Sequence, residues 1–319
     1  MLQKRVHCNV KSVLIGFGDI APRYLEVLRE LRCDISGILG RNYEKAQSKA
    51  KEFGIKKTYR NITEISSDDC DFFIITVSPE NNSEVLQQIL PLKKPILVEK
   101  PVTFSSNDLE KIISINKKSK TPIMVAMNRR FYSVFKNGLL YLRENDKKIN
   151  SIVIEAPERF TDINLPKFSE IVKRNWMFSN SIHCIDLIRF FGGSVKRIET
   201  NSNPSKYIYS AIGRCDNDVE FTYISNWKSP GSWSVTLYAD DIRITYNPLE
   251  SGTIIHNNKK IEISPTKEDV RFKPGFYFQL EHFINNIERD RDIMWPASSI
   301  TDHKHTVKLV EEIYRVNNT

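Results

Sequence analysis

The sequence lacks long apolar runs, clustered cysteines and tracts of one charge sign. No apolar stretch in its 319 residues reaches membrane-spanning length, and the N-terminus has no apolar core like that of a secretory signal. Its five cysteines are odd in number and scattered, with no C-x-x-C pair and no histidine cluster at metal-ligand spacing. These absences predict a cytoplasmic protein in a reducing compartment, with no membrane contact and no metal.

The charge of the chain is positive but dispersed. Lysine and arginine number 47 against 39 acidic residues, a net charge of +8, and the bases are interspersed with acids. This pattern disfavours nucleic acid as a partner and suits anionic small ligands. With 40% hydrophobic residues, a chain of this length is expected to form two domains.

Glycine is scarce, with 12 residues, yet two of them stand in one short loop after an apolar run at Lys11–Ile15. A helical pattern of leucines follows this G-x-G-x-x-A motif. In that setting the first glycine permits a tight turn, the second lets the backbone approach a diphosphate, and the helix N-terminus favours phosphate. The loop residues predicted to bind a dinucleotide are Gly16, Phe17, Gly18, Asp19, Ile20 and Ala21.

The next predicted strand, Ile35–Leu39, lacks the acid that NAD-binding proteins usually carry at this point for the ribose hydroxyls. Gly40 and Arg41 stand there instead. Glycine makes room and arginine can pair with a 2′-phosphate, so we expect NADP to be preferred over NAD. The alternative is that Arg41 only begins the following helix as a solvated charge.

Strands alternate with helices through the first half, which predicts a parallel sheet with right-handed crossovers. Further strands are expected at Asp71–Val77, Ile96–Val98 and Ile123–Met127. Ligands bind at the carboxyl ends of such strands. Lys100 follows one of them and can move a proton if its surroundings lower its pKa, and Pro101 can fix the turn through a cis peptide bond.

The second half changes to strand-like alternation with short turns, which predicts a large, mainly antiparallel open sheet. We place the division between a Rossmann domain at 1–125 and an α+β domain at 126–319. Two lysines at 259–260 are expected in a solvated turn after the sheet, and His303 is expected to be solvated. The strands predicted here are Ser151–Glu155, Tyr207–Ile212, Val219–Trp227, Ser232–Ala239 and Ile242–Tyr246.

A helix ending at Gly192-Gly193 carries His183 and Asp186 one turn apart. Asp186 can therefore orient His183 and hold its tautomer. A lone histidine on an apolar helix is otherwise more often a hydrogen-bonded core residue.

Taken in order, these motifs resemble the Gfo/Idh/MocA oxidoreductases, the glucose-fructose oxidoreductase and inositol dehydrogenase group. The resemblance rests on Gly16–Ala21, Thr76–Pro79, Glu99–Pro101, Asn128–Phe131, and His183 with Asp186. It implies a hydride-transfer enzyme acting on a secondary hydroxyl or ketone of a sugar or nucleotide sugar, with NADP or NAD as cofactor. It also implies a homo-oligomer, a dimer or tetramer, formed through the C-terminal sheet.

The resemblance also suggests roles for individual residues. Lys100 and His183 are the expected catalytic residues, with Lys100 beside the nicotinamide and substrate. Substrate-binding residues are expected at Arg130, Ser179, Asn180 and Tyr277. Besides the glycine loop and Arg41, cofactor contacts are expected from Thr76, Ser78, Pro79, Asn82, Glu99, Lys100 and Asn128.

One departure stands against the family pattern Asp-x-Gly-x-His before this helix. Ser179 occupies the acid position and Ser181 the glycine position. A serine can bind a sugar hydroxyl, but unaided it supplies neither negative charge nor a base at neutral pH. This motivates a second hypothesis, a catalytically impaired cofactor-binding protein that acts as a sensor or scaffold.

Overall fold

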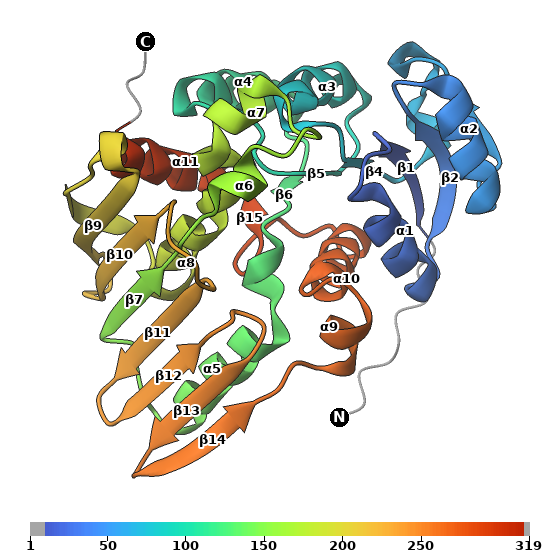
Figure 1. Ribbon diagram of the computed structural model, residues 1–319. Helices are drawn as coiled ribbons and strands as arrows, with labels where there is room; N and C mark the ends of the chain where they lie inside the picture. Colours follow the sequence, from blue (N-terminus) through green and yellow to red (C-terminus); the bar gives the residue numbers. More distant parts are fainter. Residues whose placement is uncertain (1–9, 316–319) are drawn as a thin grey trace. The chain divides into compact units, whose positions relative to one another are not determined.

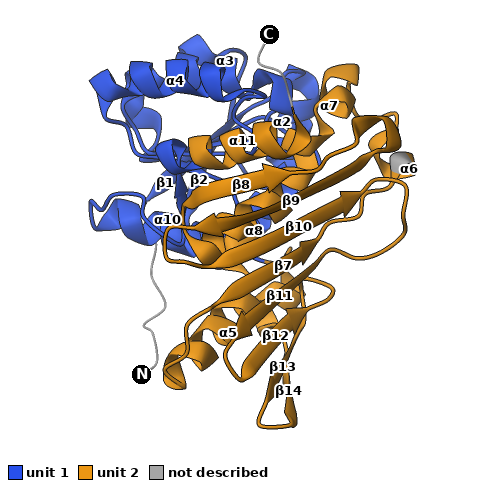
Figure 2. Ribbon diagram, turned by 90° about the vertical axis from the view of Figure 1, so that its left-hand side faces the viewer, with its two compact units in different colours: residues 1–128, 275–303 blue, residues 129–274, 304–319 orange. Residues whose placement is uncertain are grey.

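The computed structural model describes residues 10–315, which form two compact units (Figure 2). Unit 1 contains the residues up to Asn128 together with Gly275–His303, and unit 2 contains Arg129–Pro274 and the residues from Lys304 onward. The domain boundary at 125/126 stays a prediction. The expectations for Cys8, the N-terminal segment and the end of the last helix near Val316 fall outside the described residues.

Unit 1 is built on a seven-stranded sheet in the order β3-β2-β1-β4-β5-β6-β15 (Figure 1). The first six of these strands are parallel and β15 runs antiparallel to β6. This is the strand order of a dinucleotide-binding fold, whose order reverses between β1 and β4. The strands are β1 Lys11–Ile15, β2 Asp34–Leu39, β3 Lys57–Tyr59, β4 Phe72–Ile75, β5 Ile96–Val98, β6 Ile123–Val125 and β15 Ser298–Ser299.

The central strands are buried at every position, as parallel strands are when helices cover both faces of a sheet. One covering helix comes from far along the chain: Phe276 packs on Tyr24 at 4.9 Å and Phe283 on Phe72 at 5.6 Å between ring centroids. Within residues 10–315, we find no helix with the length and apolar character needed to span a membrane. The main helices of this unit are α1 Ala21–Glu30, α2 Tyr43–Glu52, α3 Asn82–Ile89, α4 Ser106–Ser119 and α10 Phe276–Glu288.

Unit 2 is built on an eight-stranded sheet in the order β14-β13-β12-β11-β7-β10-β9-β8. All neighbouring pairs are antiparallel except β7 and β10. The predicted fold class, a Rossmann sheet followed by a mainly antiparallel one, is therefore confirmed. The strands are β7 Ser151–Glu155, β8 Val195–Thr200, β9 Ile208–Cys215, β10 Glu220–Asn226, β11 Ser234–Ala239, β12 Ile242–Tyr246, β13 Gly252–His256 and β14 Lys259–Ile263.

The expectation of a solvated turn at 259–260 is wrong, because these lysines open the edge strand β14. The turn is one step earlier, at Asn257 and Asn258, whose φ values of 50° and 58° suit a tight hairpin. The sequence reasoning also missed β8, because none of its six positions is buried and its two apolar residues, Val195 and Ile198, do not alternate as in a half-buried strand. Its pairing with β9 extends the sheet at the other edge.

Helices cover one face of this sheet, and Figure 2 shows the strands in front of α5 and α8. Beneath that face Phe135 packs edge-on against Tyr246 at 4.7 Å and against Phe191 at 5.2 Å. The opposite face leaves Ile212, Ile224 and Tyr238 exposed by 54%, 44% and 39%. The main helices are α5 Ser133–Glu144, α6 Phe160–Ile163, α7 Glu170–Arg174, α8 Ile182–Gly192 and α9 Lys267–Arg271, with α11 Ile300–Tyr314 beginning in unit 1 and ending in unit 2.

Candidate active site

The glycine loop after β1 has a geometry that only glycine fits at its first position. Gly16 has φ +97°, and a Cβ there would lie 2.7 Å from the carbonyl carbon of Thr76. The Gly16 N–H donates to the Leu39 carbonyl at 2.7 Å, and the Thr76 hydroxyl donates to the Gly16 carbonyl at 2.9 Å. These bonds hold the loop against the ends of β2 and β4, the neighbours of β1 in the sheet.

Gly18, the second glycine, faces open space. A Cβ placed there would meet no atom within 4 Å. The helix α1 begins at Ala21, directly after the loop, so the positive end of its dipole lies beside the loop. A diphosphate therefore has room at this position, beside the positive end of a helix dipole.

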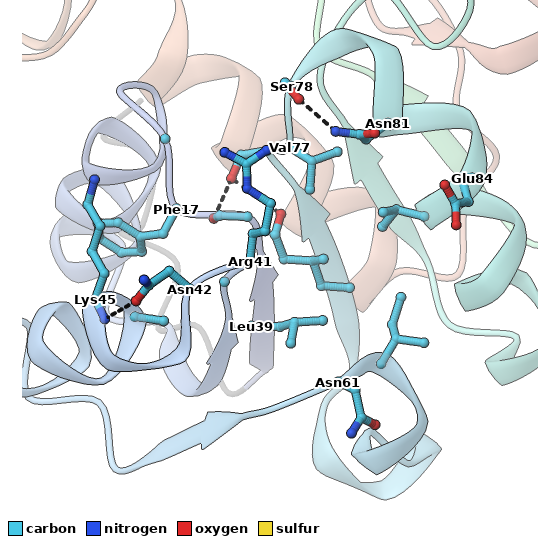
Figure 3. Close-up of a pocket in the computed structure, with 18 of the residues that line it drawn as sticks. Phe17, Leu39, Arg41, Asn42, Lys45, Asn61, Val77, Ser78, Asn81 and Glu84 are labelled. Atoms are coloured by element: carbon cyan, nitrogen blue, oxygen red, sulfur yellow. Dashed lines mark hydrogen bonds between the residues drawn. The ribbon is translucent and has the colours of Figure 1, made fainter.

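A cavity of about 590 Å³ opens at the ends of β1, β2 and β4 (Figure 3). It lies at the point where the strand order reverses, as expected for a dinucleotide site. Of the predicted cofactor residues, its lining includes Gly16, Phe17, Gly18, Arg41, Thr76 and Ser78. Residues that the sequence reasoning did not single out also line it, among them Lys45, Arg60, Asn61 and Asn81.

Three of the lining residues, Arg41, Lys45 and Arg60, are basic. Asn42 caps α2 by accepting from the Lys45 N–H at 2.8 Å, which sets the direction of the helix that carries Lys45. The Arg60 guanidinium lies 3.9 Å from the ring centroid of Tyr43. Arg60 was missed because it follows β3, a strand of three residues with too little pattern to predict.

Lys100 follows β5, and the backbone on each side of it is held by one buried amide. Asn82 Nδ2 donates to the Glu99 carbonyl at 2.9 Å and to the Pro101 carbonyl at 2.8 Å. The Lys100–Pro101 peptide is cis, as the turn suggested. Asn82 is fully buried, and its Oδ1 has no hydrogen-bond partner among the described residues. Its amide thus anchors the backbone of the lysine that we expect to be catalytic.

The Glu99 carboxylate links this turn to two helices. It accepts from the Tyr24 hydroxyl at 2.6 Å and from the Lys100 N–H at 3.2 Å. Burial, and then the charge of Glu99, raises the pKa of Tyr24 well above its ordinary value, so Tyr24 remains a donor. Gln279 of α10 donates to the same hydroxyl at 3.3 Å. The segment that returns to unit 1 thereby supports the lysine turn.

The other predicted residues of unit 1 take positions around these strand ends. Asn128 is buried three residues beyond β6, and Tyr277 is half-buried on α10. Ser78 accepts a hydrogen bond from Asn81 at 2.8 Å, as Figure 3 shows. Their roles in cofactor or substrate binding stay predictions, as do those of Asp19, Ile20, Ala21 and Pro79.

In unit 2, the expected pairing of Asp186 with His183 is wrong. Asp186 accepts hydrogen bonds from Arg130 Nε and Nη2, both at 2.6 Å, and from the Thr306 hydroxyl at 2.8 Å. His183 is buried one turn earlier on α8. A guanidinium fork and a hydroxyl together satisfy both oxygens of Asp186, so helical spacing alone misassigned its partner.

His303 also differs from its expectation, because it is fully buried rather than solvated. It lies in the first turn of α11, on the buried side of that helix. The alternating exposure along α11 leaves His305 exposed. Among residues 10–315, no group of three or more histidine, cysteine or acidic side chains is arranged to hold a metal ion.

Sequence reasoning missed Glu158, a buried acid. It is 5% exposed and accepts hydrogen bonds from Trp176, Asn180 and Ser181, all at or within the π-helical turn Met177–Ser181 that precedes α8. Burial raises the pKa of Glu158. Ser179, at the acid position of the family pattern, is buried in the same turn. No local motif marks Glu158, which lies outside any regular element.

Comparisons with known proteins agree with the motifs described above. Residues 10–127 match the Gfo/Idh/MocA model, described as an oxidoreductase family with an NAD-binding Rossmann fold. The Rossmann part of the chain therefore matches the Gfo/Idh/MocA oxidoreductase family. The resemblance inferred from the motifs is thereby confirmed, and with it an enzyme that binds NAD(P).

Curated relatives and a solved structure match the chain over nearly its whole length. A scyllo-inositol 2-dehydrogenase (NADP(+)) of Bacillus subtilis is 21% identical over 326 residues, covering 95% of each chain. A myo-inositol 2-dehydrogenase of Thermotoga maritima is 23% identical, covering 93% of this chain and 92% of the other. A solved Gfo/Idh/MocA family oxidoreductase from Vibrio cholerae has a TM-score of 0.79 at 20% identity, covering 96% of this chain and 97% of that one.

Proposed function

We propose that the chain is an NADP(H)-preferring dehydrogenase or reductase of a cyclic polyol, a sugar or a nucleotide-linked sugar. The observation that carries this proposal is the cavity at the reversal of strand order, which is lined by the glycine loop and by Arg41 where an acid would favour NAD. The inositol dehydrogenases among the relatives support a polyhydroxylated substrate.

The preference for NADP(H) rests on the cations that line the cavity. Arg41, Lys45 and Arg60 are among the lining residues, and no acid stands at the Gly40-Arg41 position. A 2′-phosphate binds guanidinium groups through charge-assisted hydrogen bonds, whereas a ribose hydroxyl gains little from them. These cations do not repel NAD(H) either. We therefore expect NAD(H) to bind, but with lower affinity than NADP(H).

Lys100 is the proposed proton donor and acceptor. A nicotinamide bound in this fold supplies the hydride chemistry itself. Lys100 would give or take the proton of the reacting hydroxyl, and its turn is held for this purpose by Asn82 and Glu99. Binding of the same oxygen by His183, or a proton relay through it, stays a prediction.

The first experiment is a titration of cofactor-free protein with NADPH and NADH, followed by turnover assays with scyllo-inositol, myo-inositol and nucleotide-linked sugars. We expect tight NADPH binding, weaker NADH binding and turnover of at least one of these compounds. Lys100→Met should lower kcat by about 10²- to 10⁴-fold while NADPH binding changes little. Lys111→Met on α4, an exposed lysine, is the matched control.

Two outcomes would contradict the proposal in different ways. Wild-type turnover retained in Lys100→Met would eliminate the lysine mechanism. Joint binding of cofactor and sugar with no hydride transfer in either direction would favour the sensor or scaffold, the function suggested by the serine at position 179. Turnover that rises in Ser179→Asp would instead identify a weakened enzyme.

The exposed face of the unit 2 sheet is the proposed oligomer interface. Ile212, Ile224 and Tyr238 are exposed on strands β9, β10 and β11. Apolar side chains gathered on one sheet face are typical of an interaction surface. Sedimentation of wild type and Ile224→Asp checks this: a dimer or tetramer should dissociate in the variant, and a wild-type monomer would contradict the proposal.

A further inference from the structure

Glu158 has no role in the chemistry described above, yet three donors converge on its carboxylate. Trp176 Nε1 donates to Oε2 at 2.9 Å and the Ser181 hydroxyl donates to Oε1 at 2.7 Å. Asn180 Nδ2 reaches both oxygens, at 3.2 and 3.0 Å. All three donors are neutral and lie between residues 176 and 181, immediately before α8. The Glu158 carboxylate therefore anchors this turn through hydrogen bonds from three side chains.

The position of Glu158 is itself well supported. Its N–H donates to the Asn226 carbonyl at 3.0 Å, and the preceding carbonyl, that of Pro157, accepts from Trp233 Nε1 at 2.9 Å. The Arg129 guanidinium lies 4.6 Å from the Trp233 ring centroid, and its charge lowers the pKa that burial of Glu158 raises. After the three neutral donors, a guanidinium stacked on Trp233 thus offsets a smaller part of the effect of burial on this carboxylate.

The hydrogen bond from Asn180 has a consequence for substrate binding. A carboxylate only accepts hydrogen bonds, so it fixes Nδ2 of Asn180 toward Glu158. Oδ1 is then the atom of this half-buried amide that is left to accept from a ligand. Without the Glu158 carboxylate, the Asn180 amide could flip and present Nδ2 to a ligand instead of Oδ1. Glu158 therefore determines which hydrogen-bonding group Asn180 offers.

Ser181 connects this arrangement to the departure from the family pattern. A glycine at that position would have no hydroxyl to donate, whereas Ser181 is fully buried and donates to Glu158. The acid missing at position 179 and the hydroxyl gained at 181 both concern the same turn as Glu158. Glu158, which follows β7, thus supplies a carboxylate that is hydrogen-bonded to this turn.

We propose that Glu158 is a positioning residue for substrate recognition: it fixes the Asn180 amide so that Oδ1 accepts a hydrogen bond from a substrate hydroxyl. This inference rests on the proposed function. It assigns the preference for a hydroxyl, over a carbonyl or ether oxygen at that substrate position, to the Glu158–Asn180 pair. An ether or carbonyl oxygen cannot donate to Oδ1, so such a compound would bind more weakly.

One test needs no turnover. The indole N–H signal of Trp176, assigned with Trp176→Phe, reports the hydrogen bond to Glu158 in a ¹H–¹⁵N NMR spectrum. We expect the signal to shift as Glu158 titrates and to lose that pH dependence in Glu158→Gln. Glu155→Gln, an exposed acid on β7, is the control and should leave the signal unchanged. A Trp176 signal that ignores Glu158→Gln overturns the inference.

A second test separates positioning from general stability, with scyllo-inositol as the probe. Glu158→Gln and Asn180→Ala should each raise KM by about tenfold with little change in kcat, and NADPH affinity should not change. The double variant should match Asn180→Ala, because Glu158 acts through that amide. Additive effects would overturn the inference. If Glu158→Gln does not fold, Ser181→Ala, which keeps the carboxylate, replaces it.

The two tests distinguish the failure of each proposal. If wild type turns over none of the polyols or sugars, the proposed function fails, and the Trp176 signal still decides whether Glu158 holds the turn. If wild type is active but Glu158→Gln leaves KM unchanged, the proposed function stands and the positioning role is overturned.

Discussion

Arg130 and Asp186 form a buried, two-point ion pair. Both bonds measure 2.6 Å, and the two side chains are exposed by only 3% and 1%. Arg130 is the second residue after the unit boundary at Asn128/Arg129, and Asp186 lies in the middle of α8. The pair therefore ties the start of unit 2 to its central helix. Arg130 was predicted to bind substrate, a role that stays a prediction.

Removing one member of this pair should destabilise the protein strongly. Asp186→Asn removes the negative charge that accepts two hydrogen bonds from the buried Arg130, so we expect a loss of about 3–5 kcal/mol in the free energy of unfolding. Glu220→Gln is the control, because its pair with Arg214 is exposed by 51% and 56% and should contribute about 1 kcal/mol or less. Urea denaturation measures both, and equal losses would contradict the prediction.

Changing each of the two loop glycines to alanine should affect a different property, stability for Gly16 and NADPH binding for Gly18. Gly16→Ala meets backbone atoms of Thr76 and has a left-handed φ, so we expect a stability loss of about 2–3 kcal/mol. Gly18→Ala meets nothing within 4 Å and should change stability by about 0.5 kcal/mol or less, while weakening NADPH binding by filling space for the diphosphate. Chemical denaturation and a cofactor titration separate the two effects.

Arg41→Ala should change cofactor preference. Loss of charge-assisted bonds to a 2′-phosphate predicts about 10- to 100-fold weaker NADPH binding, and NADH binding should change by about threefold or less. Lys51→Ala, in the last turn of α2 and outside the cavity lining, removes the same charge and should change neither affinity. Equal weakening of both cofactors in Arg41→Ala would indicate a role other than phosphate recognition.

Glu158 should make stability depend on pH. Its folded-state pKa is raised above the ordinary 4.5 by burial, so the folded state binds the proton more tightly than the unfolded chain. The resulting stabilisation is fully present below pH 4.5 and is lost as the pH rises through the raised pKa. Relative to Glu158→Gln, wild type should lose stability over this rise. Denaturation of both proteins from pH 4 to 7 measures the difference, and a constant difference would refute the prediction.

Local patterns were sufficient wherever one element and its neighbours along the chain decide the outcome. The G-x-G-x-x-A loop lies between β1 and α1 as predicted, because a tight turn at a positive φ needs glycine and the helix that follows places the positive end of its dipole beside the loop. Lys100 stands at the end of β5 for a similar reason, since an apolar run that stops at charged residues marks a strand end. The family and its cofactor class followed from these motifs.

Pairings across the sheets depended on the tertiary structure. The spacing of His183 and Asp186 on one helix suggested a pair, but Asp186 bonds to Arg130, 56 residues away. Periodicity shows which face of a helix is buried and not which partner meets it. The edge strand β14 and its neighbour β13 were likewise overlooked, because most of β14 is exposed and its polar residues resemble a loop.

The sequence by itself determined the Rossmann half, the glycine loop, the position of Lys100 and the missing acids at positions 41 and 179, because each depends on residues adjacent in the chain. Only the tertiary structure decided that Gly275–His303 returns to unit 1, that Gln279 and Tyr24 support Glu99, and that Glu158 binds the turn before α8. These contacts join residues far apart in the chain. Their free energy comes from burial and from satisfying buried polar groups, which no local pattern records.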